Sequence, residues 1–439
     1  MPGQQPENLS AESWMEKGDQ AFKQQNHQKA VEFFSKAVDV NPRLAFGYFK
    51  RGNSYIELEK LKEALADFNN AIMLNPGFSF AYFKRGSVLM SMRQYRRSID
   101  EFSQALELNP GFIYAHYKRG YCYYMLKEFK NAINDFTNTV NINPTYADAY
   151  LNRGNAFFEQ KQIDEAIEDY SRVIDIDPQH ERAFISRGIA YGALKKYDRA
   201  IQDYTHAIQI NADTVLAYNY RGLIYSLKKQ YAKAILDFDK VIAANPSEPD
   251  LYNNRGIAYF ALREFDKAIK DYDKAISLSS KSANIYYNRG NANYYLKKYS
   301  DALFDYDKAI ELQPELAAAL LGRANALSGL NQHKEAIKEY TRTLTFNPRL
   351  VQAYIGRGNM FMKLKLYRRA QEDYTLAIEI KPDYAQAYLN RGMAFRSDEN
   401  FSDAASDFNE YLKKANNRGA TCAKVKTWIK KLGYEPIVD

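Results

Sequence analysis

Apolar residues recur along this chain at the spacing of a helix that buries one face, in short segments separated by regular polar breaks. Tyr252 and Ile257 belong to one such segment, and Ala268, Tyr272 and Ile276 belong to the next. Each pair of segments predicts two helices, A and B, joined by a short turn. No segment shows the alternation typical of a strand, so the pattern predicts an all-α chain.

The pair of predicted helices repeats with a period of 34 residues, which gives twelve units. A fixed period of this length indicates a solenoid, in which each unit packs mainly on its neighbours. We expect a disordered polar tail over 1–10, twelve repeats over 11–418, a capping helix over 419–433 and a short tail over 434–439. The repeats begin at residues 11, 45, 79, 113, 147, 181, 215, 249, 283, 317, 351 and 385.

Four places in the repeat, counted from its first residue, carry the expected packing. Place 8 is glycine except for Ala324, place 20 is alanine except for Ser98, and place 24 is always Phe or Tyr. Small residues let two helix axes approach the low end of the usual ~8–10 Å separation, and the aromatic ring supplies buried area. Proline at place 32 in nine repeats cannot continue helix B and ends it.

This combination of residues resembles the tetratricopeptide repeat, and the resemblance covers residues 11–418. The second repeat carries the pattern in Tyr48, Gly52, Tyr55, Ala64, Phe68, Ala71 and Pro76. The resemblance implies an α-solenoid, a right-handed superhelix of twelve helical hairpins closed by a C-terminal capping helix. It also implies that the A helices line a concave groove, which in this family usually binds peptides or extended protein segments.

Composition narrows the function classes. The net charge is +8, but residues 413–439 alone hold seven basic and two acidic residues, so a basic stripe suited to nucleic acid is not expected. Cys122 and Cys422 form no disulfide framework, which fits a reducing compartment. No signal peptide and no membrane span are expected, so we predict a soluble cytoplasmic protein, with the cytoskeleton or a cilium as the other setting.

Enzyme chemistry has no evident place in the chain. The repeats leave too few residues for a catalytic domain, the five histidines lack metal-ligand spacing, and no phosphate-binding glycine loop appears. We therefore expect no catalytic residues, no cofactor and no metal.

Arginine at place 7 and an acidic residue at place 23 occur together in every repeat from the second onward. The first repeat has neither, since it carries Lys17 and Phe33 at these places. This joint absence predicts that each arginine pairs with the acid of its own repeat, and half-exposed pairs of this kind contribute about 1 kcal/mol or less. The alternative is a row of arginines that faces an acidic ligand.

The family resemblance implies that places 2, 5, 6, 9 and 12 of the A helices face the groove. In repeats two to four, places 5 and 6 hold three aromatic residues and three lysines: Phe49, Phe83, Tyr117, Lys50, Lys84 and Lys118. Place 2 of the same repeats is aromatic as well: Phe46, Phe80 and Tyr114. Lysines flanked by aromatics suit an acidic segment with apolar side chains. The alternative is that the lysines form a solvated face and the aromatics only pack.

Asparagines are frequent at the same places along the chain. They include Asn152, Asn254, Asn288 and Asn390 at place 6, and Asn53, Asn155, Asn291, Asn325 and Asn359 at place 9. Because an amide both donates and accepts, such a row can bind the backbone of an extended peptide. The row is similar to the asparagine ladder of O-GlcNAc transferases and kinesin light chains; the alternative is ordinary polar surface. The carboxylate clamp of chaperone adaptors finds no match, so binding of chaperone tails by that mode is not expected.

Two functions remain, and both need protein partners. The first is a scaffold or adaptor that holds extended or acidic protein segments in the groove. The second is a structural component of a cytoskeletal or ciliary assembly that docks through the basic row in the A–B turns, and RNA binding is a distant third. The row consists of Arg93, Lys127, Lys161, Lys195, Lys229, Arg263, Lys297 and Lys365. The sequence leaves the oligomeric state and the partner open.

Overall fold

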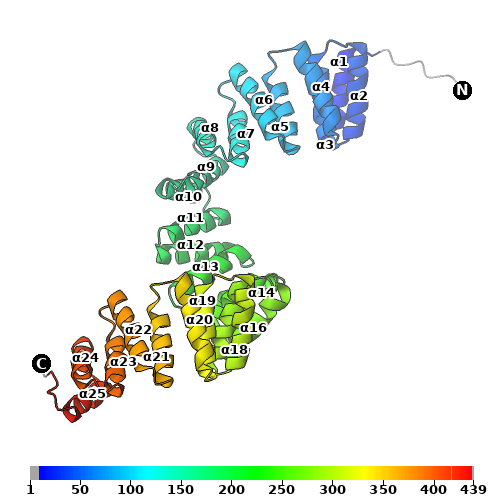
Figure 1. Cartoon of the computed structure of the whole chain (residues 1–439). Helices are drawn as coiled ribbons and strands as arrows, with labels where there is room; N and C mark the ends of the chain where they lie inside the picture. The colour runs from blue at the N-terminus through cyan, green and yellow to red at the C-terminus, as the bar shows by residue number, and fades with distance from the viewer. Residues whose placement is uncertain (1–8, 417, 438–439) are drawn as a thin grey trace. The chain divides into compact units, whose positions relative to one another are not determined.

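The computed structural model describes residues 9–416 and 418–437, and the regular structure in them consists of twenty-five α-helices without a strand (Figure 1). Most of the tail expected over residues 1–10 lies outside the described residues. The prediction of an all-α chain of helical hairpins is confirmed. Contacts divide the chain into two parts, which meet between Tyr220 and Arg221, and each part is described by itself.

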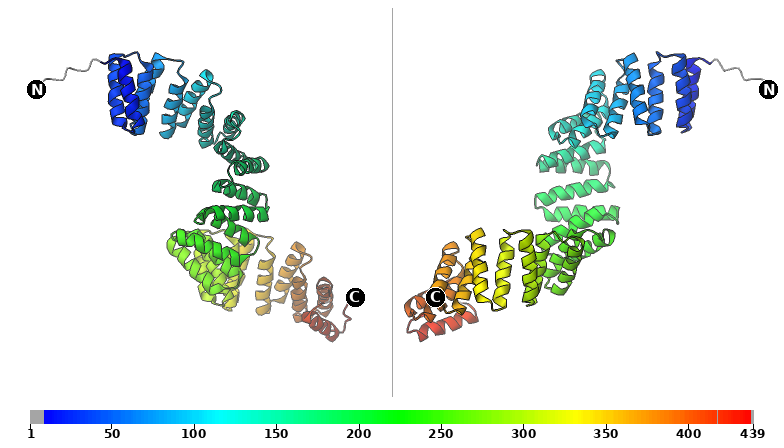
Figure 2. Two further views of the ribbon diagram at one scale, coloured as in Figure 1. Left: turned by 180° about the vertical axis from the view of Figure 1, so that it is seen from behind. Right: turned by 45° about the vertical axis from the view of Figure 1, so that its right-hand side comes forward.

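The helices alternate between the A and B helices of the hairpins. The A helices are α1 (Ala11–Lys23), α3 (Ala45–Glu57), α5 (Ser79–Ser91), α7 (Ile113–Met125), α9 (Ala147–Glu159), α11 (Glu181–Ala193), α13 (Val215–Leu227), α15 (Pro249–Ala261), α17 (Ala283–Tyr295), α19 (Ala317–Gly329), α21 (Val351–Lys363) and α23 (Ala385–Ser397). The B helices are α2 (His27–Val40), α4 (Leu61–Leu74), α6 (Tyr95–Leu108), α8 (Phe129–Ile142), α10 (Ile163–Ile176), α12 (Tyr197–Ile210), α14 (Tyr231–Ala244), α16 (Phe265–Leu278), α18 (Tyr299–Leu312), α20 (His333–Phe346), α22 (Tyr367–Ile380) and α24 (Phe401–Lys414). Within each part, consecutive hairpins lie side by side (Figure 2).

Two local devices separate the helices. In the A–B turn the residue at place 15 adopts a left-handed backbone, with φ of 58° at Lys195, which reverses the chain within three residues. After helix B the residue at place 31 is extended in the repeats before the last, and its side chain often accepts from the N–H two residues on. Asn75 Oδ1, for example, accepts from Gly77 N at 3.1 Å. Such a side chain stabilises the bend into the next helix.

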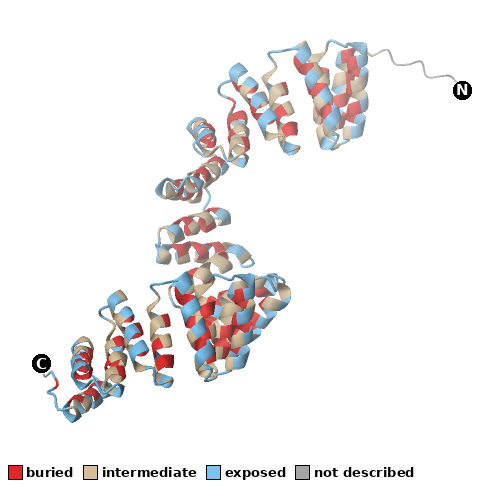
Figure 3. Cartoon of the chain, in the orientation of Figure 1, coloured by how far each residue is buried: buried red, intermediate tan, exposed pale blue. Residues whose placement is uncertain are grey.

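The core of each hairpin is the aromatic ring at place 24, which is fully or almost fully buried. Buried residues recur along the helices of both parts (Figure 3). The glycine at place 8 of the same repeat lies directly against this ring. A Cβ atom added to Gly256 would lie 2.6 Å from Cε1 of Tyr272, and one added to Gly52 would lie 2.8 Å from Cε1 of Phe68. Both separations are shorter than van der Waals contact, so the glycine sets how closely helices A and B approach.

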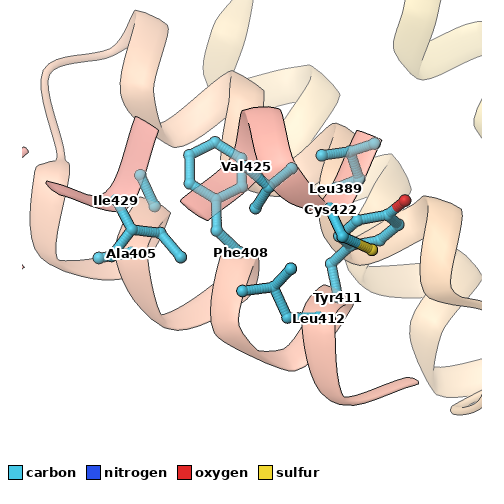
Figure 4. Close-up of a cluster of buried hydrophobic side chains, with 9 residues drawn as sticks. Leu389, Ala405, Phe408, Tyr411, Leu412, Cys422, Val425 and Ile429 are labelled. Carbon is cyan, nitrogen blue, oxygen red and sulfur yellow. The ribbon is translucent and has the colours of Figure 1, made fainter. Parts of the chain in front are cut away.

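The chain continues beyond the twelfth hairpin with helix α25 (Ala420–Lys431), which covers α24. Cys422, Val425 and Ile429 are buried from α25 and pack against Phe408 and Leu412 of α24 (Figure 4). The capping helix expected in this region is therefore present. The following segment is held to α24 as well, since Asn409 Oδ1 accepts from the backbone N–H of Ile437 at 2.8 Å.

The predicted pairing of arginine and acid within each repeat is confirmed. All eleven pairs are in contact, with N–O distances between 2.5 and 3.0 Å. The expectation of half-exposed pairs is wrong: the acids are 1–17% exposed and the arginines 15–27% exposed. Because the arginines are engaged inside the chain, they do not form a free row facing a ligand.

Most of these arginines also reach the preceding hairpin, which the sequence did not indicate. Arg153 donates to Thr137 Oγ1 of the previous helix B at 3.1 Å, and Arg85 donates to Asn69 Oδ1 at 2.7 Å. The acceptor at place 25 differs in type between repeats, so it leaves no fixed residue in the pattern. One guanidinium thus links the two helices of its own hairpin to the hairpin before it.

Candidate functional site: a pocket and a lysine pair on the A helices

A pocket of about 290 Å³ lies on the A helices of the first three repeats. We call it the α3 pocket, because six of its eight lining residues come from α3. Five were predicted from the sequence (Phe46, Phe49, Lys50, Asn53 and Lys84), and three more complete it (Phe22, Ile56 and Glu57). Of these, Phe22 and Ile56 occupy place 12, one of the places expected to face the groove, so that place held the signal that would have found them.

Of the three lysines in the predicted row, only Lys84 and Lys118 keep a charge that no acidic side chain in the described part of the chain balances. Lys50 Nζ forms an ion pair with Asp19 Oδ1 of the preceding repeat at 2.9 Å, so its charge is already balanced. Neither Lys84 nor Lys118 has an acidic partner among the described residues. Burial lowers the pKa of Lys118, and the nearby charge of Lys84 lowers it further. Two uncompensated cations side by side favour an anion between them.

The aromatics at place 5 are packing residues. The ring of Phe49 is 9% exposed and lies 4.8 Å from the ring of Phe78. Phe83 and Tyr117 pack in the same way on the aromatic residue at the end of their own repeat, Phe112 and Tyr146. The three predicted place 5 aromatics therefore serve mainly in packing within their own repeats.

The aromatics at place 2 are the ones that face solvent. Phe46, Phe80 and Tyr114 are 47%, 51% and 57% exposed. Phe46 lies at the α3 pocket, where Lys50 Nζ is 5.1 Å from its ring centroid. A bound segment would meet these rings and the free lysines together.

The predicted asparagines are partly engaged within the chain. At place 6, Asn152 donates to the hydroxyl of Tyr117 at 2.9 Å, Asn288 donates to Asn253 at 3.0 Å, and Asn390 donates to Asn359 at 3.3 Å. Each of these bonds joins one A helix to the A helix before it. These three asparagines therefore link neighbouring repeats. Only the amide donors and acceptors that these bonds do not use are left for a ligand.

Asn254, the fourth predicted asparagine at place 6, lines a second pocket, in the C-terminal part of the chain. This pocket of about 450 Å³ has mostly apolar walls, from Leu223, Leu227, Tyr231 and Ile257 among others. Leu227 is 63% exposed, so the pocket offers an apolar surface to solvent. None of the described residues that line it is a cation.

A larger depression, of about 780 Å³, contains none of the predicted site residues. It is an open hollow between α22 and α23, lined by Arg368, Glu372, Phe395 and Asp398 among others. Its charges are mixed, and Asp398 already contacts Arg368 at 3.8 Å. We place the candidate site at the smaller α3 pocket, because uncompensated charge and exposed aromatic surface occur together there.

Two further searches cover the described residues alone. They bring no three His, Cys, Asp or Glu side chains together in a way that would hold a metal ion. None of their helices has the length and apolar character that crossing a bilayer requires.

Comparison with known proteins identifies the repeat. Sequence models described as tetratricopeptide repeat match residues 11–44, 45–78, 83–139, 147–180, 185–249, 249–282, 283–316 and 355–419, and one described as TPR repeat matches 123–161. Together these matches cover most of the chain. No curated protein matches it by sequence.

Several solved structures are similar in fold. YrrB, described as a TPR protein with an unusual peptide-binding site, is 27% identical over 43% of this chain and 96% of its own, with a TM-score of 0.40. Cut9–Hcn1, a hetero-tetramer of APC/C, is 13% identical over 97% and 96%, with a TM-score of 0.46. Yeast Tom70 is 18% identical over 96% and 95%, with a TM-score of 0.39. From the family matches, which cover most of the chain, we conclude that this chain belongs to the tetratricopeptide repeat family.

Proposed function

We propose that this protein is a non-catalytic scaffold that binds an extended, acidic segment of another protein along the A helices of repeats one to four. The observation that carries the proposal is the α3 pocket next to the free charges of Lys84 and Lys118. An apolar side chain of the segment enters the pocket, and a neighbouring carboxylate lies between the two lysines. Membership of a family whose A helices usually bind peptides supports the same function.

Electrostatics favours an acidic partner at this place. Lys118 is partly withdrawn from water and close to Lys84, so both ammonium groups gain from a carboxylate that neutralises them. A cationic segment would instead meet repulsion from Lys84 and Lys118. Exposed Phe46 and Phe80, on α3 and α5, give the segment apolar contacts.

The proposal is tested by binding of a fluorescein-labelled acidic peptide with interspersed aromatic residues, measured by anisotropy. The double variant Lys84→Glu with Lys118→Glu is expected to weaken binding at least tenfold, because two attractive charges become repulsive. A matched control is Lys195→Glu with Lys229→Glu, which makes the same charge change on two exposed turn residues. Equal losses in both double variants would contradict binding at the groove.

A second candidate function, docking through the A–B turns, is supported by a separate observation. The eight basic residues of the turn row are all exposed and all hold the same left-handed backbone, so their side chains recur at equivalent points of successive hairpins. A filament or another acidic surface in a cytoskeletal or ciliary assembly suits such a row. If only the Lys195→Glu with Lys229→Glu variant loses its partners in a pull-down, this function replaces the first.

A further inference from the structure

The asparagine at place 9 and the tyrosine at place 24 form a hydrogen bond inside the repeat wherever both are present. The tyrosine hydroxyl donates to the asparagine Oδ1 atom. The four cases are Tyr170 to Asn155 at 2.9 Å, Tyr306 to Asn291 at 2.8 Å, Tyr340 to Asn325 at 2.7 Å and Tyr374 to Asn359 at 2.8 Å. This bond holds the amide oxygen toward the core of the hairpin and satisfies both buried groups.

The second repeat breaks this arrangement at the α3 pocket. It has Asn53 at place 9, but Phe68 at place 24, and phenylalanine has no hydroxyl. The Oδ1 atom of Asn53 is buried and has no hydrogen-bond partner. A buried acceptor without a donor is costly and is rare in folded proteins. The fold itself therefore leaves one acceptor unsatisfied, on a residue that lines the pocket.

The unsatisfied oxygen can be turned toward a ligand without the loss of any bond. A half-turn of the Asn53 amide exchanges its oxygen and nitrogen, and the oxygen has no partner to give up. In the four repeats with tyrosine this oxygen lies at the tip of the ring at place 24, and from that we infer that Asn53 Oδ1 lies at the ring of Phe68. The turn would then place the NH₂ group against the ring, a weakly favourable contact, and the oxygen toward the pocket. In the four repeats with tyrosine the same turn would break the bond to the hydroxyl. Asn53 can therefore offer its oxygen to a ligand, whereas the oxygens of the other four asparagines are already bound by tyrosine hydroxyls.

We propose that the α3 pocket takes a tyrosine side chain of the bound acidic segment, and that its hydroxyl donates to Asn53 Oδ1. This inference rests on the proposed function and names the side chain that anchors the segment. The ligand would supply from outside the hydroxyl that Tyr170 or Tyr306 supplies from inside the other repeats. Phe22, Phe46 and Ile56 form the apolar walls for its ring.

Size and shape select tyrosine among side chains that carry a donor. A pocket of about 290 Å³ lies at the lower end of ligand pockets, so it suits one side chain. Lysine and arginine also donate, but neither has an apolar ring to cover the walls formed by Phe22, Phe46 and Ile56. Serine and threonine leave the apolar walls uncovered. Tyrosine combines a flat apolar ring with a donor at its far end.

The test uses two labelled peptides that differ by one oxygen atom. Both have nine residues, acidic apart from the central position, which is tyrosine in one peptide and phenylalanine in the other. The wild-type protein is expected to bind the tyrosine peptide about five- to tenfold more tightly, the ratio for one hydrogen bond that satisfies a buried acceptor. Dissociation constants come from anisotropy titrations with the full chain.

The variant Phe68→Tyr gives the sharpest comparison. It supplies the missing hydroxyl from inside the repeat, so Asn53 Oδ1 is held inward and the tyrosine preference is expected to fall to about one. It is expected to fold, because tyrosine is fully buried at the same place in Tyr204, Tyr272 and other repeats. The matched control Phe102→Tyr makes the same change one repeat later, where place 9 is Ser87, and leaves the ratio unchanged.

Each outcome decides the inference. Equal binding of both peptides by the wild type would refute the tyrosine anchor while leaving the scaffold function intact. A preference that persists in Phe68→Tyr would show that Asn53 is not the acceptor, and a preference that persists in Asn53→Ala, which removes the amide altogether, would show the same independently. Failure of both peptides to bind would contradict the proposed function together with the anchor.

Discussion

The substitution Asp169→Ala tests whether the buried ion pairs hold the hairpins together. Asp169 accepts from Nε and Nη2 of Arg153 at 2.8 and 2.7 Å, and the side chain of Asp169 is only 7% exposed. Removing the carboxylate leaves a guanidinium that is 16% exposed without its counter-ion. A buried charge that loses its partner costs about 3–5 kcal/mol. We expect the lower end of that range, because Arg153 keeps its bond to Thr137.

The pair as a whole is expected to matter far less than either half alone. Burial raises the pKa of Asp169, and this effect exceeds the lowering by Arg153. Because withdrawal from water offsets the attraction, replacing both residues together, as Arg153→Met with Asp169→Leu, is expected to change the unfolding free energy by less than about 1 kcal/mol. The exposed control Asp164→Ala, on the same helix and 77% exposed, is expected to cost less than about 0.5 kcal/mol.

Urea denaturation followed by circular dichroism gives these free energies. Hydrogen exchange is needed beside it, because a solenoid unfolds in segments and the loss is expected to concentrate in α9 and α10. If Asp169→Ala costs no more than Asp164→Ala, the pairs behave as surface ion pairs, and the claim that they fix neighbouring hairpins is refuted.

Single contacts lead to three further predictions. Gly256→Ala is expected to cost about 1–3 kcal/mol in urea denaturation, because the new methyl group overlaps the ring of Tyr272; an unchanged midpoint would contradict the close approach. Lys195→Gly is expected to stabilise by about 0.5–1 kcal/mol, since glycine relieves the left-handed φ of 58°, and a lower thermal midpoint would count against this. Affinity for the acidic peptide is expected to hold while Lys118 is charged and to fall as pH rises through its pKa, which burial and then Lys84 lower below the ordinary lysine range. In Lys84→Gln this fall moves to higher pH, and a titration that shows no such shift would contradict the coupling of the two lysines.

The fold was predictable because its determinants are residue identities at fixed places. Glycine at place 8 and the ring at place 24 meet within one repeat. The ion pairing was indicated by the first repeat, which has Lys17 and Phe33 in place of both the arginine and the acid. The bonds from the arginines to the preceding hairpin were not predictable, because the acceptors range from Ser35 to Asn69 and Asp239. At place 25 the side chain offers an oxygen acceptor in each of these repeats, while the residue type differs from one repeat to the next.

The sequence indicated several residues of the α3 pocket but not which of their charges are free. Lys50, Asn53 and Lys84 line the pocket together with the aromatics Phe46 and Phe49. Binding of a segment by these residues stays a prediction. The pattern did not indicate which of these side chains already form an ion pair or a hydrogen bond within the chain. Lys50 is neutralised by Asp19, and Asn152 is held by Tyr117, through side-chain directions that depend on packing between repeats. Only such contacts distinguish Lys84, Lys118 and Asn53 from their equivalents.

Photo-crosslinking tests the central claim most directly, because it reports where a bound segment lies. An acidic peptide with a benzophenone group at its centre is bound to the full chain, irradiated and mapped by mass spectrometry. The account predicts crosslinks to α1, α3, α5 and α7, concentrated around Phe46 and Lys84, and their loss in Lys84→Glu with Lys118→Glu. Crosslinks that fall mainly on the A–B turns or on the B helices would contradict it.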